Sequence, residues 1–352
     1  RIKIMAYSSI VKPTDYFNTV LYTGDGSTSN AITGVGFQPD FLWIKGRDET
    51  YNHNLFDAIR GSKYWLGSNT NSAEDTGTAY PNSFDSDGFT LNSGGSTNAS
   101  SDTYVAWNWL ASGSTASNSD GSITSTVSAN TTAGFSIVTY TGTGSAASVG
   151  HGLGVKPDMI ISKIRSTTGD WNVYHDSFAA QERIKLNSTA AKSTNASIFA
   201  SLPTSSVVNI GTGGDINTSS GTHLFYCFAE KKGYSKIGSY TGNGNADGPF
   251  VYTGFKPAWV LVKTTTDAGY NWVMYDNKRV GFNPDNDTLT ANETRVEQTT
   301  GFGHIDMLSN GFKVRASTND TNRNANVFIY MAFAENPFVA NDSGTAVPVV
   351  AR

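Results

Sequence analysis

The chain has 352 residues, of which 38% are hydrophobic and 15% are charged, and its net charge is −4. This length suits two or three domains with hydrophobic cores, while the net charge and the lack of long basic runs argue against a nucleic-acid or anionic-membrane partner. The single cysteine, Cys227, excludes an internal disulfide framework, and no apolar run reaches the roughly 18 residues that a membrane-spanning helix needs.

The N-terminal stretch "RIKIMAYSSIVKP" lacks the apolar segment of a secretory signal, so we expect no signal peptide. Met5 opens "MAYSS", which reads like a natural start, and the sequence leaves open whether residues 1–4 are native. We expect residues 1–16 to form an arm that precedes the first folded unit.

A five-residue motif occurs three times, as "YTGDG" at 22–26, "YTGTG" at 140–144 and "YTGNG" at 240–244. A glycine, a proline and a lysine follow each tyrosine at the same three offsets. Repeats of this length predict copies of one structural unit. We therefore expect three units, at 17–112, 134–231 and 235–337.

The pattern inside each unit is that of β-strands. The closing segments 104–111, 223–230 and 329–335 alternate apolar residues on one face, and turn dipeptides precede the strands at 87–91 and 310–314. Residues 175–186 are the best candidate for a short helix. The pattern predicts an all-β chain of three tandem antiparallel β-sandwiches, with jelly-roll or lectin-like strand order left open.

The connections between the units differ. Residues 113–133 are rich in Ser, Thr and Gly, which predicts an extended or flexible linker between the first two units. Only "KKGY" at 231–234 separates the second unit from the third, so we expect these two to form a rigid pair. Residues 338–352 show no periodic pattern and are expected to form a C-terminal arm.

A lysine and an aspartate recur in every unit, 12 or 13 residues apart. The lysines end one predicted strand and the aspartates end the next aromatic segment: Lys45 with Asp57, Lys163 with Asp176, and Lys263 with Asp276. They could be a ligand-contacting charge pair or an ion pair within each hairpin. The structural ion pair is favoured, because it recurs in every copy while the loops vary.

No catalytic or metal-binding motif stands out. The five histidines show no metal-ligand spacing, and the acidic stretches "DSDG" (85–88) and "NPDNDT" (283–288) do not continue as calcium loops, so we interpret them as Asx turns. We find no serine-hydrolase, zinc-protease or phosphate-loop signature. The sequence therefore predicts a non-enzymatic protein without cofactors.

Aromatic residues in or near the predicted inter-strand segments suit carbohydrate binding. An aromatic ring covers the apolar face of a sugar, while neighbouring amides and carboxylates take its hydroxyls. Packing of loops over the sandwich ends would use the same residues. The candidates are Tyr51, Tyr64, Trp65, Tyr80, Trp171, Tyr270 and Trp272.

Four segments, "DYFNTVLYTGDGSTSNAITGVGFQPDFLWIK", "SFDSDGFTL", "YVAWNW" and "FAENPF", resemble marine tailed-phage virion proteins of the structural or tail-fibre-like kind. The resemblance covers about residues 11–338, and the second unit departs most because it lacks the Asp-Gly turn. It implies a virion surface protein, made in the host cytoplasm, whose partners are other virion proteins, further copies of itself (a trimer is one arrangement) and a host-surface glycan.

Three functions are compatible with these features. The first is a tail-fibre or appendage adhesin that binds the host surface, with affinity multiplied through several copies. The second is a structural capsid or tail decoration protein that stabilises the particle. The third is a polysaccharide-degrading enzyme on the same scaffold. We favour the adhesin.

Overall fold

The computed structural model describes residue 8, residues 10–301 and residues 303–337. Strands dominate the described chain, and the few helices are single short turns. The predicted all-β class is therefore confirmed. None of the helices in the described part has both the length and the hydrophobicity that crossing a bilayer requires.

The elements fall into three successive groups. The first group comprises η1 (Pro13–Asp15), β1 (Phe17–Thr23), β2 (Asn30–Thr33), β3 (Phe41–Gly46), β4 (Asn54–Asp57), β5 (Gly61–Leu66), β6 (Asp75–Thr76), β7 (Ser83–Asp85), β8 (Gly88–Leu91), α1 (Gly95–Asn98) and β9 (Thr103–Trp109).

The second group comprises β10 (Ala116–Asn118), β11 (Ser125–Asn130), β12 (Phe135–Thr141), β13 (Ala147–Gly150), β14 (Met159–Ile164), β15 (Asn172–His175), β16 (Glu182–Lys185), β17 (Ser193–Thr194), β18 (Val207–Ile210), α2 (Gly214–Asn217) and β19 (Thr222–Phe228).

The third group comprises β20 (Ser235–Thr241), β21 (Phe250–Tyr252), β22 (Phe255–Thr264), β23 (Val273–Asp276), β24 (Leu289–Thr290), β25 (Ile305–Leu308), β26 (Gly311–Val314), α3 (Asn319–Asn322) and β27 (Val327–Pro337). We call the three groups the first, second and third units.

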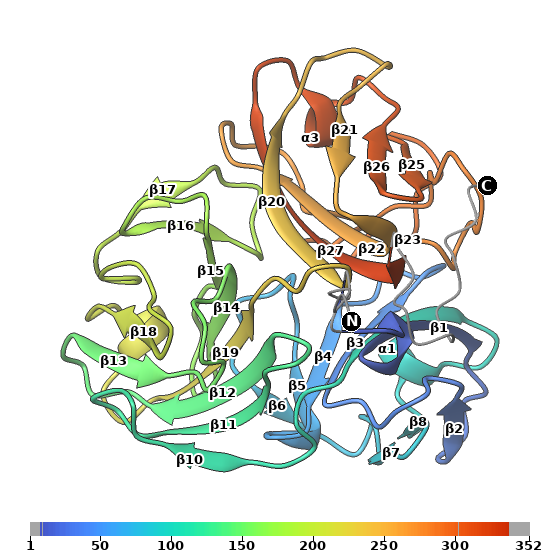
Figure 1. Cartoon of the computed structure of the whole chain (residues 1–352). Helices are drawn as coiled ribbons and strands as arrows, with labels where there is room; N and C mark the ends of the chain where they lie inside the picture. Colours follow the sequence, from blue (N-terminus) through green and yellow to red (C-terminus); the bar gives the residue numbers. More distant parts are fainter. Residues whose placement is uncertain (1–7, 9, 302, 338–352) are drawn as a thin grey trace, which may run out of the picture.

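The three units share one strand order. The large sheets run β1-β9-β3-β4-β5-β6 in the first unit, β10-β11-β12-β19-β14-β15-β16-β17 in the second and β20-β27-β22-β23-β24 in the third, so that the shared order begins at β1, β12 and β20. A small sheet accompanies each of them: β2-β8-β7, β13-β18 and β21-β26-β25. Figure 1 shows the units as three lobes around a common centre, with the second at the left, the third at the top and the first at the lower right.

The repeated tyrosine motif builds the same corner in each unit. The tyrosine hydroxyl donates to a backbone carbonyl of the short helix: Tyr22 to Thr97 over 2.8 Å, Tyr140 to Ile216 over 2.6 Å and Tyr240 to Thr321 over 2.6 Å. The motif's first glycine lies so close to the chain after that helix that a Cβ on Gly24, Gly142 or Gly242 would meet a carbonyl oxygen at 2.1–2.3 Å. The motif therefore joins the opening strand to the helix, which explains its recurrence.

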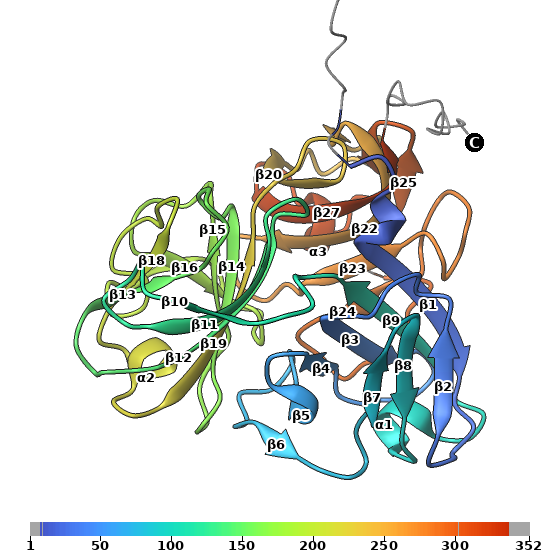
Figure 2. The same ribbon diagram turned by 60° about the horizontal axis from the view of Figure 1, so that its bottom comes forward.

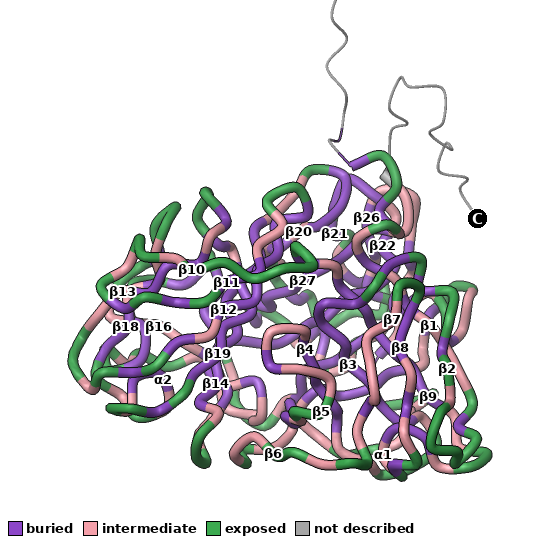
Figure 3. The backbone as a smooth tube through the Cα atoms, turned by 90° about the horizontal axis from the view of Figure 1, so that it is seen from below, coloured by how far each residue is buried: buried purple, intermediate pink, exposed green. Residues whose placement is uncertain are grey.

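Each large sheet buries both faces. Its outer face packs against the small sheet of its own unit, so that every unit has a core between two sheets. Its inner face joins one core that all three units share. In this shared core the ring of Phe17 stacks on Phe333 at 5.1 Å, Phe41 stacks on Tyr226 at 4.2 Å, and Trp109 meets Trp259 edge-on at 5.6 Å. The units are thus parts of one body. Figure 2 shows the three lobes from a second direction, and in Figure 3 most of the chain where they meet is purple, that is, buried.

Two sequence-based expectations are wrong. Residues 113–133, predicted to be an extended or flexible linker outside the units, instead contain β10 and β11, which form an antiparallel pair and extend the second unit's sheet beside β12. Residues 175–186 contain the end of β15, a turn and the whole of β16 instead of a helix, and the alternating pattern around Ile184 places that residue in the shared core. The arm predicted at 338–352, and residues 1–7 of the arm predicted at 1–16, lie outside the described residues.

Candidate functional site

The predicted lysine–aspartate ion pairs do not form at any of the three positions. In the antiparallel pairing of β3 with β4, Asp57 lies opposite Phe41, four residues before Lys45, so the two charges stand at opposite ends of the hairpin. Asp57 instead forms an ion pair with Arg60, and Asp176 forms one with Lys156. The prediction failed because it placed the charges by chain distance instead of by strand register.

The same aspartates connect neighbouring units. The hydroxyl of Tyr226, in the second unit, donates to Asp57 Oδ2 in the first over 2.8 Å. The indole of Trp107, in the first unit, donates to Asp276 Oδ2 in the third over 3.1 Å, and Arg279 Nε holds the same oxygen at 2.6 Å. Asp57 and Asp276 are therefore buried structural residues.

The three lysines are buried, and their ammonium groups donate to backbone carbonyls. Lys163 Nζ lies 2.7 Å from its own unit's Ile164 oxygen and 3.4 Å from Asn71 in the first unit. Lys263 likewise reaches Thr189 in the second unit, whereas Lys45 stays within its own unit. Burial lowers the pKa of each lysine to about 8, since desolvation disfavours the charged form.

Two of the predicted sugar-binding aromatics are core residues. Trp171 and Trp272 are 0% and 1% exposed and belong to the shared core. Their indole N–H groups donate over 2.8 Å to backbone carbonyls of the preceding unit, at Gly67 and Lys185. Both are therefore structural residues, but they pack between units and not over the sandwich ends, where the alternative interpretation places them.

Three other predicted aromatics lie within residues 64–80 of the first unit. The rings of Trp65 and Tyr80 stack at 6.3 Å, and Tyr64 is 40% exposed on the same strand as Trp65. Tyr51 and Tyr270 lie elsewhere. The hydroxyl of Tyr51 donates to Asp102 over 2.9 Å, and that of Tyr270 accepts a hydrogen bond from Arg323 in the third unit. The structure thus brings two of the seven candidates, Trp65 and Tyr80, together, whereas Tyr64 precedes Trp65 on the strand and points to its opposite face.

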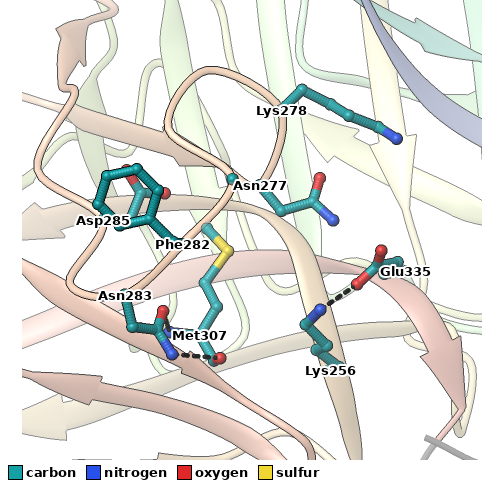
Figure 4. A pocket seen from close by; sticks show the side chains of 9 residues that line it. Lys256, Asn277, Lys278, Phe282, Asn283, Asp285, Met307 and Glu335 are labelled. Atoms are coloured by element: carbon teal, nitrogen blue, oxygen red, sulfur yellow. Dashed lines mark hydrogen bonds and ion pairs between the residues drawn. The ribbon is translucent and has the colours of Figure 1, made fainter. Parts of the chain in front are cut away.

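A cavity of about 520 Å³ opens in the third unit (Figure 4). One side is formed by the loop between β23 and β24, and the others by residues of β22, β25 and β27. In the first two units, residues that pair across the equivalent hairpin are eleven positions apart, but Met274 pairs with Leu289, fifteen positions on. The additional length carries the side chains that line the cavity, so this site belongs to the third unit alone among the described units.

The most unusual group in the cavity is a buried carboxyl. Asp285 is 2% exposed, and neither of its oxygens accepts a hydrogen bond. The backbone N–H of Asp287 makes a weak favourable contribution without hydrogen-bond geometry. Burial raises the pKa of Asp285 to about 8. Asn277, on the same wall, leaves its Oδ1 without a partner as well. Unpartnered buried polar atoms are costly, so a native structure with several at one place suggests a ligand.

The rim combines an apolar ring with charged groups. Phe282 is 69% exposed, the most of any large apolar side chain described. Lys256 Nζ holds Glu335 Oε2 at 2.5 Å on the opposite wall (Figure 4). Asn283 fixes the loop, because it donates to the carbonyl of Met307 over 3.1 Å and accepts from its N–H over 2.9 Å. The cavity thus offers a flat apolar surface next to anchored acceptors.

Sequence reasoning missed this site. The stretch 283–288 was interpreted as ordinary Asx turns, and Phe282 was not singled out. A signal did exist: the span from the motif tyrosine to the closing aromatic is 93 residues in the third unit, against 87 and 88 in the others. Extra length in one copy of a repeat marks a place where the chain departs from the shared scaffold.

The chemistry of the cavity favours binding of a small polar molecule. In the described part of the chain, no cluster of His, Cys, Asp or Glu is suited to hold a metal ion. The oxygens of Asp285 and Asn277 can accept hydrogen bonds from a ligand, and Phe282 can stack on an apolar ring face.

Comparison with known proteins gives one result. No curated protein matches the chain. A family model described as a domain of unknown function, DUF7483, matches residues 12–337, which include all three units and the cavity, and the chain therefore belongs to that family.

Proposed function

We propose that this protein is a non-enzymatic phage virion surface protein that binds a host-surface glycan, and that the cavity of the third unit holds the sugar. The observation that carries the proposal is the exposed ring of Phe282 beside a buried carboxyl with no partner, Asp285. Sugars present an apolar face and a rim of hydroxyl donors, and this pairing of ring and acceptors suits both.

The location on a virion rests on the resemblance of the repeated motifs to tailed-phage structural proteins. The fold supports such a role physically, because three units around one core form a compact body with short loops. A single shallow site binds weakly, and several copies of the chain on one particle would multiply the affinity. Other virion proteins and further copies of the chain are the partners this role requires.

A glycan array tests the proposal. The purified full chain should bind a defined set of glycans, and Phe282→Ala should weaken that binding at least tenfold by removing the stacking surface. Phe250→Ala is the matched control, since Phe250 is a 46% exposed phenylalanine of the same unit outside the cavity. If the array shows no binding, or if both variants bind like the wild type, the proposal is wrong.

A polysaccharide-degrading enzyme is a second candidate, favoured by one observation. Two carboxyl groups, Asp285 and Glu335, line the same cavity, and burial raises the pKa of Asp285 to about 8. Glycosidases use a protonated and an ionised carboxyl in this way. Release of reducing ends from a bound polysaccharide, abolished in Asp285→Asn, would favour the enzyme over the adhesin.

A further inference from the structure

We infer that the ligand of the third-unit cavity carries a primary ammonium group, as in an amino sugar that is not N-acetylated. This inference rests on the proposed glycan-binding function and specifies the class of glycan. It follows from the balance of charges and donors around Asp285.

The cationic side chains near Asp285 are not available to pair with it. Arg279, which is fully buried, donates through Nε to Asp276, through Nη1 to Glu297 over 3.0 Å and through Nη2 to the carbonyl of Met274 over 3.1 Å. Lys256 is held by Glu335. Lys278 is exposed at the rim, where solvent and salt screen its charge. Asp285 therefore has no cation of its own.

The unpartnered acceptors lining the cavity suit an ammonium in kind. The two oxygens of Asp285 and Oδ1 of Asn277 all lack a donor. An ammonium group has three N–H donors and no acceptor, whereas a hydroxyl offers one donor and no charge to balance a carboxylate. The exposed face of Phe282 adds a favourable surface for a cation.

Binding of an ammonium should release a proton from the protein. Burial has the largest effect on Asp285 and opposes its ionisation; Arg279 favours ionisation, Asp276 and Asp287 oppose it as burial does, and the pKa of Asp285 is about 8. An ammonium in the cavity stabilises the carboxylate, so at neutral pH the carboxyl must give up its proton to solvent as the ligand binds. The affinity for the ammonium form should therefore rise as the pH increases from 6 toward 8.

Isothermal titration calorimetry with the full chain tests this inference. The probes are a glucosamine tetrasaccharide and the N-acetylglucosamine tetrasaccharide, which differ only in the charge and acylation of the amine. At pH 6, where the amine of the glucosamine probe already carries its proton, we expect the wild type to bind this probe at least tenfold more tightly and to release the proton of Asp285, seen as different heats in two buffers of different ionisation enthalpy. In Asp285→Asn both the preference and the proton release should disappear, and Asp247→Asn, at an exposed acidic residue of the same unit, should retain both.

The outcomes separate this inference from the proposed function. Equal affinity of the wild type for the two probes, or an unchanged preference in Asp285→Asn, overturns the ammonium inference. So does binding of only acetylated or neutral glycans that is lost in Phe282→Ala, although the glycan-binding proposal then stands. If no glycan binds in a Phe282-dependent way, both are wrong.

Discussion

Glu297 of the third unit forms an ion pair with Arg47 of the first, with Oε1 of the carboxylate 2.7 Å from Nη2 of the guanidinium. The same carboxylate holds Arg279 of its own unit at 3.0 Å. Glu74 makes the corresponding pair of contacts between Arg60 of the first unit and Arg165 of the second. Because the last unit is joined to the first, the three units form a closed ring.

Replacing Glu297 should therefore destabilise the whole protein. Glu297→Gln leaves two buried or half-buried guanidinium groups short of a partner, and breaking such a pair costs about 2–4 kcal/mol. Urea unfolding measures the loss. Asp15→Asn removes an exposed pair with Lys12 and should change the free energy of unfolding by less than about 1 kcal/mol. Equal effects of the two substitutions would show that the contact of Glu297 with the first unit stabilises the fold no more than an exposed ion pair does.

The shared core makes a second prediction. Phe333 contacts aromatic rings of all three units, including Phe17, Phe228 and Trp259, and is 1% exposed. Phe333→Ala should lower the free energy of unfolding by about 3–5 kcal/mol, since a cavity opens where the units meet. Unfolding should remain a single transition when followed by both tryptophan fluorescence and circular dichroism. Two separate transitions would mean that the units fold independently.

Features of the fold that depend on neighbouring residues in the chain could be predicted from the sequence, whereas contacts between distant segments could not. The alternation in 104–111 is a local pattern, and it led correctly to a strand. The contacts of Trp171 with the neighbouring unit depend on how separate units pack, which no local pattern encodes. For the same reason the sequence could suggest three sandwiches but not their common core.

The candidate site, too, could be predicted from the sequence only in part. The extra residues around Phe282 and Asp285 could be counted in the sequence, but their polarity resembled that of any surface loop. Only the structure shows that Asp285 is buried without a partner, while the segment around it remains exposed. Burial of a single side chain within a polar stretch has no periodic signature.

Asp285 should also control how stability depends on pH. Its pKa is about 8 in the folded chain and near the ordinary aspartate value of 3.8 in the unfolded chain, so between these values the folded state binds more protons and stability falls as the pH rises. Asp285→Asn removes this dependence. We expect it to be more stable than the wild type by about 2 kcal/mol at pH 8 and to lose that advantage at pH 4, as measured by urea unfolding. A difference independent of pH would mean that the carboxyl is ionised throughout.

The buried lysines should act in the opposite direction. The pKa of Lys163 is about 8 in the folded chain, whereas an unfolded lysine keeps its proton to about 10.5, so between these values the unfolded state binds more protons and stability rises with pH. Lys163→Met lacks this group, and between pH 8 and pH 10 it should gain about 1–2 kcal/mol less stability than the wild type. The comparison isolates one lysine, because Lys45 and Lys263 titrate in both proteins. Equal gains would mean that the carbonyls of Asn71 and Ile164 keep the ammonium of Lys163 charged up to pH 10.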